Sequence, residues 1–528
     1  MKVLVVDSIA GEGLALLREH GFEVDELMRP SQEVLFSRVG EYEALITRSL
    51  TAVTPELLRH AARLRIVGRA GVGIDNIDVD ACSRRGIVVV NAPHGNVVSA
   101  AEHTVGMLLA LVRHIPQAHR LLTSLEWNRN FYGAELFRKT IGVVGLGKVG
   151  SRVAARLRAF ETRIVVYDPY VSETRARELG ATLTDLPTLL RESDVVTFHV
   201  PLTAETENML TARELSAMKP GARIVNCARG GIVNEADLLV ALEDGRIAGA
   251  AVDVWTEEPP RSEHLRRLIQ HPRMIVTPHL GANSAEAQVN VALDVARQIV
   301  AFRDGELVEF GVNVPVAHPG AVGELRPFIA LADRLGRFLV QLDPAHLDGV
   351  EVRLAGAVAH VDDAPLIGRA VLAGLLGPVM AGPVNLVNAH LVAEERGVRM
   401  SIVREDETHG YGSLLTVSTE THEGRKAIAG AVFDGQPRVV RLRDLNIEFS
   451  PEGFVLVLSY EDRPGIVGRI GSILGGLNVN IASMHVGRKS KRGRAIVVLI
   501  LDEDLTNDQV AEVAAAVEAD FARLIRLV

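Results

Sequence analysis

The chain has 528 residues, too many for a single hydrophobic core, so we expect three or four domains of ordinary size. Charged residues make up 23% and apolar residues 48%, a balance that predicts packed cores and excludes extensive disorder. The net charge of -9 disfavours a general nucleic-acid-binding protein, because such proteins carry a basic face.

The cysteine count and the length of the apolar runs indicate the cellular location of the protein. Cys82 and Cys227 are the only cysteines, too few for a disulfide framework or a zinc site, which indicates a reducing compartment and no metal centre. No apolar run approaches the ~20 residues needed to cross a bilayer. The first residues also lack the apolar core of a signal peptide. We therefore expect a cytoplasmic protein without a membrane partner.

Two stretches of alternating strands and helices dominate the first 310 residues. In residues 1–95 short apolar runs alternate with amphipathic ones, which predicts a parallel sheet covered by helices. The alternation restarts at "TIGVVGLG", after one long apolar-striped helix at 99–115 and before another at 284–305. Two such flanking helices favour a second domain inserted into the first. We expect a discontinuous substrate-binding domain of residues 1–95 and 284–312. Residues 96–283 are expected to form a nucleotide-binding domain, with a cleft between the two.

The rest of the chain predicts two smaller α+β domains. The Pro/Gly-rich stretch "NVPVAHPGAVGELRP" predicts a linker. Residues 318–450 mix strands and helices without a chemical signature, and residues 452–528 form a small terminal unit. The predicted fold class is α/β, with two doubly wound parallel-sheet lobes followed by an intervening domain and a βαββαβ domain.

A glycine-rich loop opens the second lobe. Gly145, Gly147 and Gly150 have the G-x-G-x-x-G spacing, between a predicted strand and a predicted helix. The next strand, "RIVVYDP", ends in Asp168, where a carboxylate accepts hydrogen bonds from an adenosine ribose and repels a 2'-phosphate. This pattern predicts NAD as the cofactor. Two other interpretations stay open: glycines that serve only close packing, and an Asp168 that caps the turn before Pro169.

Three polar residues follow later strands of the same lobe. Arg229 comes after "RIVNCA", Glu258 after "AAVDVW" and His279 after "MIVTP". Because ligands bind beyond the carboxyl ends of parallel strands, all three are expected to face the nicotinamide cleft. Taken singly, they could be a turn cap, a solvated charge and a satisfied buried histidine.

Together the three residues suit the oxidation of a 2-hydroxy acid by hydride transfer. The hydroxyl proton needs a base, which His279 can supply near neutral pH. Glu258 can orient the imidazole and stabilise its protonated form. The planar fork of Arg229 fits the carboxylate or the 2-oxygen of the substrate.

The chain resembles the D-isomer-specific 2-hydroxyacid dehydrogenases. The resemblance rests on "VVGLGKVG", "NCARGGIVNEADLLVAL", "AVDVWTEEP" and "VTPHLGANSAEAQ". It implies a catalytic set of Arg229, Glu258 and His279, an NAD cofactor, and a two-lobed fold. The cofactor contacts on this interpretation are Gly145, Gly147, Lys148, Val149, Gly150, Asp168, Cys227, Ala228, Arg229, Asp253 and His279.

Within that family, "ITRSLTAVTPELL" and "RIVGRAGVGIDNID" are most similar to long-form members that oxidise D-3-phosphoglycerate in serine biosynthesis. The backbone N–H groups of Val72 and Gly73 form a nest suited to the substrate carboxylate. The resemblance implies phosphate contacts from Arg48 and Arg69, although either could be a surface ion pair. Arg129 is a third phosphate candidate, supplied in some relatives by the partner subunit.

The terminal sequence "YEDRPGIVGRIGSILGGLNVNIASM" resembles an ACT domain, a module that pairs across subunits and binds amino acids. The resemblance implies a homo-oligomer, expected to be a tetramer, with L-serine as a feedback inhibitor bound by Tyr460, Asp462 and Asn480. A purely structural pairing domain is the alternative. Residues 320–450 resemble the intervening domain of the long-form enzymes, with "NAH" in place of the more usual "NAP".

Two other functions share the two-lobed fold. One is a glyoxylate or hydroxypyruvate reductase, or another D-2-hydroxyacid dehydrogenase. The second is an NAD-sensing transcriptional co-regulator. The ACT-like terminus disfavours both, because neither generally carries an amino-acid-binding module.

Overall fold

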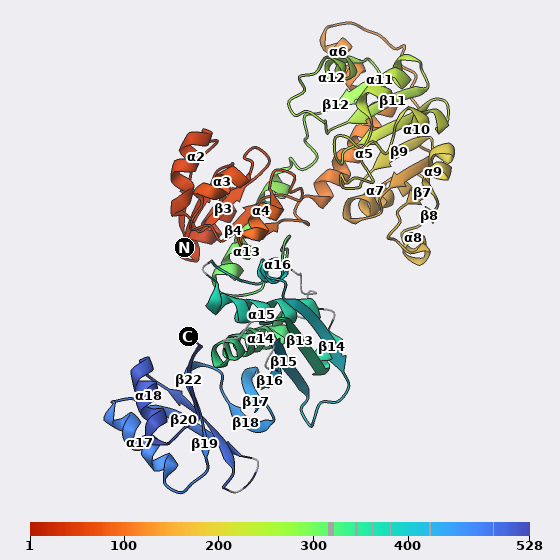
Figure 1. Cartoon of the computed structure of the whole chain (residues 1–528). Helices are drawn as coiled ribbons and strands as arrows, with labels where there is room; N and C mark the ends of the chain where they lie inside the picture. Colours follow the sequence, from red (N-terminus) through yellow and green to blue (C-terminus); the bar gives the residue numbers. More distant parts are fainter. Residues whose placement is uncertain are drawn as a thin grey trace.

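The computed structural model describes residues 1–314, 322–343, 347–361, 363–380, 382–421, 424–488, 490 and 492–527. Residues 315–321 of the predicted linker lie outside the described residues, and its last residues, 322–327, belong to a helix. Figure 1 shows four units in succession, which we name after their predicted roles: the substrate lobe in red, the nucleotide lobe in orange to yellow-green, the intervening domain in teal and the terminal domain in blue. No helix in the described ranges is long and apolar enough to cross a membrane.

The substrate lobe is a parallel five-stranded sheet in the order β2-β1-β3-β4-β5. Its strands are β1 (Lys2–Val5), β2 (Glu23–Glu26), β3 (Ala44–Thr47), β4 (Ile66–Arg69) and β5 (Val88–Asn91). Its helices are α1 (Gly11–Glu19), α2 (Gln32–Arg38), the 3-10 turn η1 (Val39–Glu41), α3 (Pro55–His60), α4 (Val79–Arg84) and, from much later in the chain, α13 (Ala285–Arg303). Because α13 packs on α1, the chain returns to this lobe after building the nucleotide lobe.

The nucleotide lobe is a parallel seven-stranded sheet in the order β12-β11-β10-β9-β6-β7-β8. Its strands are β6 (Thr140–Val144), β7 (Arg163–Tyr167), β8 (Thr182–Leu183), β9 (Val195–Phe198), β10 (Ala222–Asn226), β11 (Ile247–Val252) and β12 (Met274–Val276). Its helices are α5 (Val97–Arg113), α6 (Ile115–Thr123), α7 (Lys148–Arg158), α8 (Glu173–Glu178), α9 (Leu186–Glu192), α10 (Ala212–Ala217), α11 (Glu235–Glu243) and α12 (Glu263–Gln270). The strands are continuously apolar because helices cover both faces.

The intervening domain has a mixed six-stranded sheet in the order β14-β13-β15-β16-β17-β18, in which only β13 and β14 run parallel. The strands are β13 (Gly349–Gly356), β14 (Arg399–Glu405), β15 (Ser413–Thr421), β16 (Gly424–Phe433), β17 (Gln436–Leu442) and β18 (Leu445–Phe449). The helices are α14 (Val322–Leu342), the 3-10 turn η2 (Ala357–His360), α15 (Ala364–Leu376), the 3-10 turn η3 (Gly377–Val379) and α16 (Ala389–Glu395).

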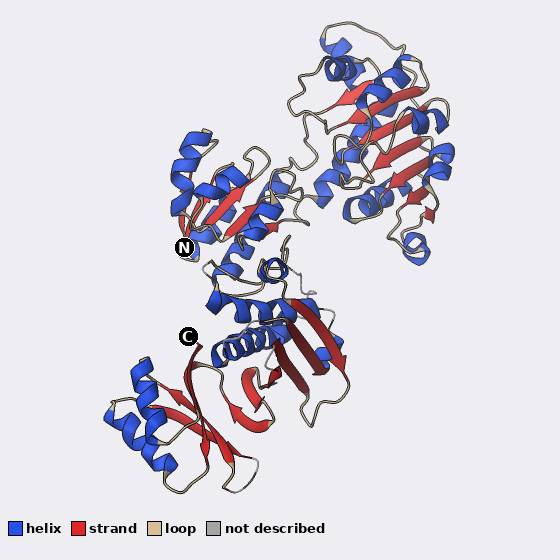
Figure 2. Ribbon diagram, in the orientation of Figure 1, coloured by secondary structure: helices blue, strands red, loops and turns tan. Residues whose placement is uncertain are grey.

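The terminal domain is an antiparallel sheet in the order β20-β21-β19-β22. Its elements are β19 (Gly453–Glu461), α17 (Ile466–Gly476), β20 (Ile481–Arg488), β21 (Arg494–Leu501), α18 (Asn507–Ala516) and β22 (Phe521–Leu527). Val455, Val498 and Ile525 belong to the same buried cluster as the intervening domain, so one face of this sheet packs against α14. Figure 2 shows the two helices on the opposite face. The predicted fold class, with its βαββαβ terminus, is confirmed.

Helices α14 and α15 cross at a close approach that two glycines permit. A Cβ on Gly374 would lie 2.0 Å from the backbone oxygen of Asp333, and one on Gly336 would lie 2.4 Å from that of Val371. Both distances are shorter than any van der Waals contact, so only glycine lets the two backbones meet. This crossing forms the centre of the largest described core cluster.

We predict that Gly374→Ala lowers the free energy of unfolding by about 2 kcal/mol, because the added methyl group forces the helices apart. Gly471→Ala is the matched control, since Gly471 lies inside α17 and a Cβ there would have nothing within 4 Å. Alanine is the better helix former, so this variant should be neutral or slightly stabilised. Guanidinium unfolding of both variants measures the difference, and equal stability would contradict the close crossing.

Candidate active site

The glycine loop joins β6 to α7 at the carboxyl edge of the nucleotide sheet. Gly145 has a positive φ of 90°, and a Cβ there would lie 2.6 Å from the carbonyl oxygen of His199. A Cβ on Gly150 would lie 2.0 Å from the oxygen of Gly145, whereas Gly147 faces open space. The loop therefore brings bare backbone and the N-terminus of α7 to a place where a pyrophosphate fits.

Asp168 connects this loop to the end of β7. One carboxylate oxygen accepts from the N–H of Leu146 at 2.8 Å, and the other accepts from the N–H of Tyr170 at 2.9 Å. The second bond is the local turn contact that the sequence left open. The first places the carboxylate against the glycine loop, where a ribose bound beside it would meet a negative charge.

A cavity of about 270 Å³ lies where the two lobes meet, and it collects most of the predicted cofactor residues. The predicted residues in its lining are Val72, Val149, Cys227, Ala228, Arg229, Asp253 and His279. The lining also includes residues that the sequence did not single out, among them Asn96 and His199. Burial lowers the pKa of His199 to about 3, so this imidazole stays neutral beside the cavity.

His279 and Glu258 form a hydrogen-bonded pair at this cavity. Nδ1 of His279 lies 2.8 Å from Oε2 of Glu258, and the N–H of Trp255 donates to the other carboxylate oxygen at 3.1 Å. Burial alone would raise the pKa of Glu258, but the hydrogen bond and charge of His279 and the amide of Trp255 hold it below its usual value. Glu258 therefore remains ionised near neutral pH, and Nδ1 of the neutral imidazole carries the proton, which leaves Nε2 as the basic atom.

A buried carboxylate holds the loop that carries His279. Asp253 follows β11, and its side chain accepts from the N–H groups of Leu280 at 2.7 Å and Gly281 at 2.8 Å, and from the hydroxyl of Thr277 at 2.5 Å. The backbone oxygen of Asp253 accepts from the N–H of His279 at 2.8 Å. These bonds fix His279 in a left-handed backbone conformation with a φ of 57°.

His103, on α5, completes this network from the helix that enters the lobe. Its Nε2 lies 3.4 Å from the Asp253 carboxylate and 3.2 Å from the Thr277 hydroxyl. Burial by itself raises the pKa of Asp253, and the bonds from His103, Thr277 and two backbone amides lower it to about 2. The resemblance implies a cofactor contact for Asp253; the structure shows it at the cavity wall with its acceptors largely used by the loop.

Arg229 reaches from the nucleotide lobe to the substrate lobe. Its Nε lies 3.3 Å from the carboxylate of Asp75, and its Nη1 donates to the backbone oxygen of Ala228 at 2.7 Å. A Cβ on Gly73 would lie 2.3 Å from its Nη2, so the "GVG" loop packs directly against the guanidinium. The predicted carboxylate nest at Val72 and Gly73 and the predicted arginine therefore share one place.

Arg48 and Arg69 add positive charge on the substrate side. Arg48 directly follows β3, and Arg69 is the last residue of β4, the adjacent strand. Nε of each is buried and, within the described part of the chain, has no hydrogen-bond partner. Burial, and then the like charges of Arg229 and Arg48, lower the pKa of Arg69 to about 10. Neighbouring cations with unused hydrogen-bond donors are stabilised by a bound anion, so this arrangement favours an anion site.

Two predicted site residues, Arg129 and Lys148, do not line the cavity. Arg129 is exposed in the segment after α6, and it is absent from the residues that line the cavity. Lys148 points across the cleft, with its Nζ 3.1 Å from Nε2 of His94 in the substrate lobe. Of the predicted phosphate contacts, Arg48, Arg69 and Arg129, none lines this cavity, and Arg129 lies on an exposed segment of the nucleotide lobe. Lys148 links the two lobes.

Two carboxylates that position residues of the site were not predicted from the sequence. Asp7, at the end of the first strand, accepts from the N–H groups of Arg48 and Thr51 at 2.7 and 3.2 Å and so sets the turn that carries Arg48. Glu235, buried in the first turn of α11, accepts from the N–H of Thr256 at 2.9 Å and fixes the segment before Glu258. An acid directly after a buried strand was the available signal for Asp7. The partner of Glu235 lies 21 residues away, so no local pattern indicates it.

The predicted effector residues lie in β19 and in the loops on either side of α17: Tyr460 in β19, Asp462 between β19 and α17, and Asn480 just before β20. Asp462 pairs with Arg488 at 2.5 Å, and Nδ2 of Asn480 donates to Asp502 at 2.6 Å. Tyr460 is only 2% exposed and belongs to the core of the terminal domain. Gly465, with a φ of 94°, caps α17 and leaves the first amides of the helix available.

Comparison with known proteins matches three regions to family models. Residues 105–281 match the NAD-binding domain of D-isomer specific 2-hydroxyacid dehydrogenases, residues 324–443 the D-3-phosphoglycerate dehydrogenase intervening domain, and residues 454–519 the ACT domain. A D-lactate dehydrogenase from Aquifex aeolicus, solved with NAD and lactic acid, is 28% identical with a TM-score of 0.53. That alignment covers 58% of this chain and 96% of the other. The two lobes and their cleft thus define an NAD-dependent D-2-hydroxyacid dehydrogenase.

Full-length relatives narrow this class. The chain is 42% identical to D-3-phosphoglycerate dehydrogenase of Synechocystis over 100% of its own length and 95% of the relative's. It is 39% identical to the enzyme of the same name from Bacillus subtilis, over 100% and 99% of the two lengths. The chain belongs to the D-3-phosphoglycerate dehydrogenase family.

We predict that Glu258→Gln narrows the pH range of activity in the reductive direction. Reduction needs a protonated imidazole at His279, and the variant removes the anion that stabilises it. The alkaline limb of kcat/KM should therefore move to lower pH by about one unit.

Glu257→Gln serves as the matched control for this change. Glu257 is the preceding residue, is partly exposed, and accepts hydrogen bonds from the N–H groups of Arg261 and Ser262. Its loss removes the same charge from the same segment without touching His279, so the pH profile should stay in place. If the two variants shift alike, the effect is a general charge effect and the pairing does not control the limb.

Proposed function

We propose that this chain catalyses the NAD-dependent oxidation of D-3-phosphoglycerate to 3-phosphohydroxypyruvate in serine biosynthesis. The observation that supports it most directly is the cleft itself. His279, of a histidine–carboxylate pair on one lobe, lines the same cavity as Arg229, and the charges of Arg229 and Arg48 both act on Arg69 of the other lobe. On this proposal residues 1–95 and 284–312 hold the substrate, and residues 96–283 hold the cofactor.

The residues divide the chemistry as follows. Nε2 of His279 takes the proton of the C2 hydroxyl, while Glu258 keeps the ring oriented and stabilises the imidazolium. Arg229 and the amides of Val72 and Gly73 bind the carboxylate and the developing 2-oxo group, and Arg48 with Arg69 binds the phosphate. NAD, when bound, accepts the hydride from C2. The charge of Asp168 beside the ribose favours NAD over NADP.

The whole-chain match favours this activity over the two alternatives. The relatives named D-3-phosphoglycerate dehydrogenase align across the intervening and terminal domains, not only across the two lobes. A hydroxypyruvate reductase or an NAD-sensing regulator also has no evident use for a second and third arginine close enough for their charges to interact with that of Arg229. The two free cysteines agree with a reducing, cytoplasmic location.

The test of this proposal is His279→Ala. Loss of a positioned acid–base group costs about 10²- to 10⁴-fold in rate, so kcat for 3-phosphoglycerate should fall by that factor while NAD binding stays nearly normal. NADH absorbance gives the first quantity and calorimetry with NAD the second. A near-normal kcat in this variant would overturn the assignment of the base.

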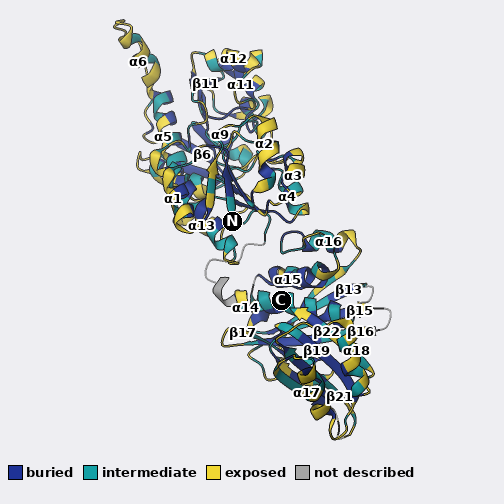
Figure 3. Cartoon of the chain, turned by 90° about the vertical axis from the view of Figure 1, so that its left-hand side faces the viewer, coloured by how far each residue is buried: buried dark blue, intermediate teal, exposed yellow. Residues whose placement is uncertain are grey.

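We also propose that the enzyme is a homo-oligomer, expected to be a tetramer. Helix α6 has no buried residue, and the apolar side chains of Leu122, Leu125, Trp127 and Tyr132 are 55% to 92% exposed. Figure 3 shows α6 projecting from the nucleotide lobe, coloured largely as exposed. An apolar segment of this kind marks an interface with a second copy. Arg129 lies within it, so pairing would carry Arg129 toward a partner's cleft.

Feedback inhibition by L-serine is the regulatory part of the proposal. Asp462, Asn480 and the free amides at the start of α17 offer groups for the ammonium and carboxylate of an amino acid. Tyr460 lies in the core, so we expect it to support this site by packing. A ligand held between paired terminal domains favours whichever domain arrangement fits it.

We predict that Asn480→Ala raises the serine concentration for half-inhibition by about 10-fold or more, because the amide would contact the amino acid directly. The uninhibited kcat should stay close to that of the wild type. Asn507→Ala is the control, since Asn507 lies at the start of the other helix, α18, of the same domain. Inhibition curves against serine measure both; identical curves for wild type and Asn480→Ala would remove Asn480 from the effector site.

A further inference from the structure

A second, larger cavity lies outside the catalytic cleft, at the seam between the substrate lobe and the intervening domain. Its volume is about 720 Å³. One side is formed by the start of β4, the end of α4 and the segment after α13. The facing side is formed by α14, α15 and the loop at residues 383–387. Figure 1 shows α15 and α16 directly beneath the substrate lobe, so the cavity is bounded by two different domains.

Fixed contacts close one end of this seam cavity. Val387, from the intervening domain, is 1% exposed and belongs to the hydrophobic core of the substrate lobe. Beside it, Nδ2 of Asn385 donates to the backbone oxygen of Gly86 at 2.8 Å. Asn385 in turn accepts from the N–H of Val387 at 2.9 Å, which holds the loop in shape. The two domains are therefore joined at a packed, hydrogen-bonded point, and the cavity beside that point is part of a defined interface.

The cavity lining combines an apolar wall with an excess of positive charge. Its two carboxylates, Glu306 and Asp333, are already engaged with Arg326 at 3.6 Å and Arg337 at 2.6 Å. Two more arginines line the same space without an ion pair to any described residue.

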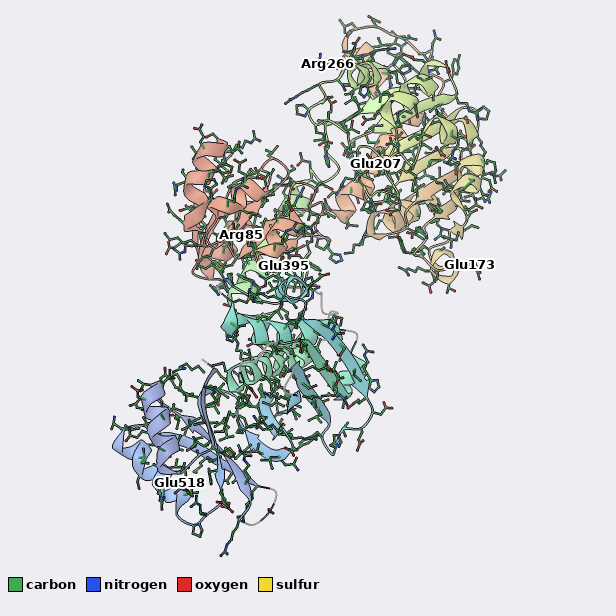
Figure 4. All side chains as sticks on the ribbon, viewed as in Figure 1. Arg85, Glu173, Glu207, Arg266, Glu395 and Glu518 are labelled. Carbon is green, nitrogen blue, oxygen red and sulfur yellow. The ribbon has the colours of Figure 1, made fainter. Side chains whose placement is uncertain are left out.

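The first of these, Arg65, lies over the ring of Phe302 at 5.2 Å, and the second, Arg85, donates only a long bond of 3.4 Å to the backbone oxygen of Ala61. Figure 4 shows Arg85 on the substrate lobe and Glu395 of α16 on facing sides of the seam. The lining thus holds four cations against two carboxylates.

We infer that the seam cavity binds a small organic anion with an apolar body. The anionic group would lie between the guanidinium groups of Arg65 and Arg85. The apolar body would lie against Phe302, Ile329 and Val384, which line the same space. Pockets that combine apolar walls with a few charged groups are typical of small-molecule sites. A compact trianion such as the substrate itself lacks an apolar body and does not fit this lining.

Two strands connect the seam cavity to the catalytic cleft. Strand β4 begins beside Arg65, in the cavity wall, and ends at Arg69 in the arginine cluster. Strand β5 begins at Val88, also in the wall, and ends at Asn91, whose Nδ2 donates to the backbone oxygen of Val72 at 2.6 Å. A ligand that spreads or tightens the seam therefore acts on the elements that hold two substrate-binding groups. Any such coupling is reciprocal, so the substrate would also change the affinity for the ligand.

The test uses 8-anilinonaphthalene-1-sulfonate, a fluorescent sulfonate with an aromatic body, and the full-length protein saturated with NAD to cover the nucleotide site. We expect saturable binding to the wild type. Arg85→Glu should weaken that binding by about 10-fold, because it replaces an attractive charge with a repulsive one. Arg84→Glu is the matched control: Arg84 is the exposed neighbour on α4 and does not line the cavity, so its change should be less than about 2-fold.

A second pair of measurements separates this site from the catalytic cleft. Ala373→Phe fills the cavity from α15 and should abolish binding without reversing any charge. Saturating 3-phosphoglycerate should leave the probe bound, changing its affinity by no more than about 5-fold, the lower end of ordinary coupling between sites. The inference is overturned if the wild type shows no saturable binding below millimolar probe, if Arg85→Glu and Arg84→Glu bind alike, or if 3-phosphoglycerate displaces the probe completely. None of these outcomes depends on turnover, so they are independent of the proposed activity.

Discussion

The loop that carries His279, the proposed base, is positioned by the buried carboxylate of Asp253. This carboxylate sits at the end of β11 and accepts hydrogen bonds from Thr277, Leu280 and Gly281, which surround His279 in the chain. The left-handed backbone of His279 is unfavourable for a residue with a side chain, so it persists only where surrounding contacts over-determine it. With the loop fixed, Nδ1 of His279 meets Glu258, and its other nitrogen is left for the substrate.

The insertion of one lobe into the other brings residues from both lobes to the same cleft. His279 and Glu258 belong to the nucleotide lobe, whereas Arg48 and Arg69 belong to the substrate lobe, and Arg229 reaches from the first to the second. The chain crosses twice between the lobes, before α5 and before α13. His103 on α5 contacts the Asp253 network, so the helix that enters the lobe also supports the catalytic loop. A change in the angle between the lobes would therefore act on the proposed acid–base group and the proposed anion site together.

The two domains of the C-terminal half share packed cores with each other and with the substrate lobe. One face of the terminal sheet shares a buried cluster with α14, and the intervening domain places Val387 in the core of the substrate lobe. A path of packed contacts thus runs from the terminal domain to the lobe that holds Arg48 and Arg69. Packed cores resist gradual deformation, which is why a ligand at a distant domain can change a site through such contacts.

The sequence determined much of this protein directly. Alternating apolar runs specified the two parallel sheets, because strands buried on both faces must be apolar. The spacing of Gly145, Gly147, Gly150 and Asp168 indicated the nucleotide loop, because that backbone path tolerates few other residues. Arg229, Glu258 and His279 could be placed at one edge because the carboxyl ends of parallel strands meet there.

Only the tertiary structure decided which groups hold those residues in place. Glu235 and Thr256, or His103 and Asp253, are far apart in the sequence, and their hydrogen bonds arise only when separate strands and helices pack together. The buried position of Tyr460, the exposure of Arg129 outside the cavity lining and the cavity at the domain seam were decided in the same way. Local sequence records the conformation of a segment, whereas burial and contact depend on what the rest of the chain places against it.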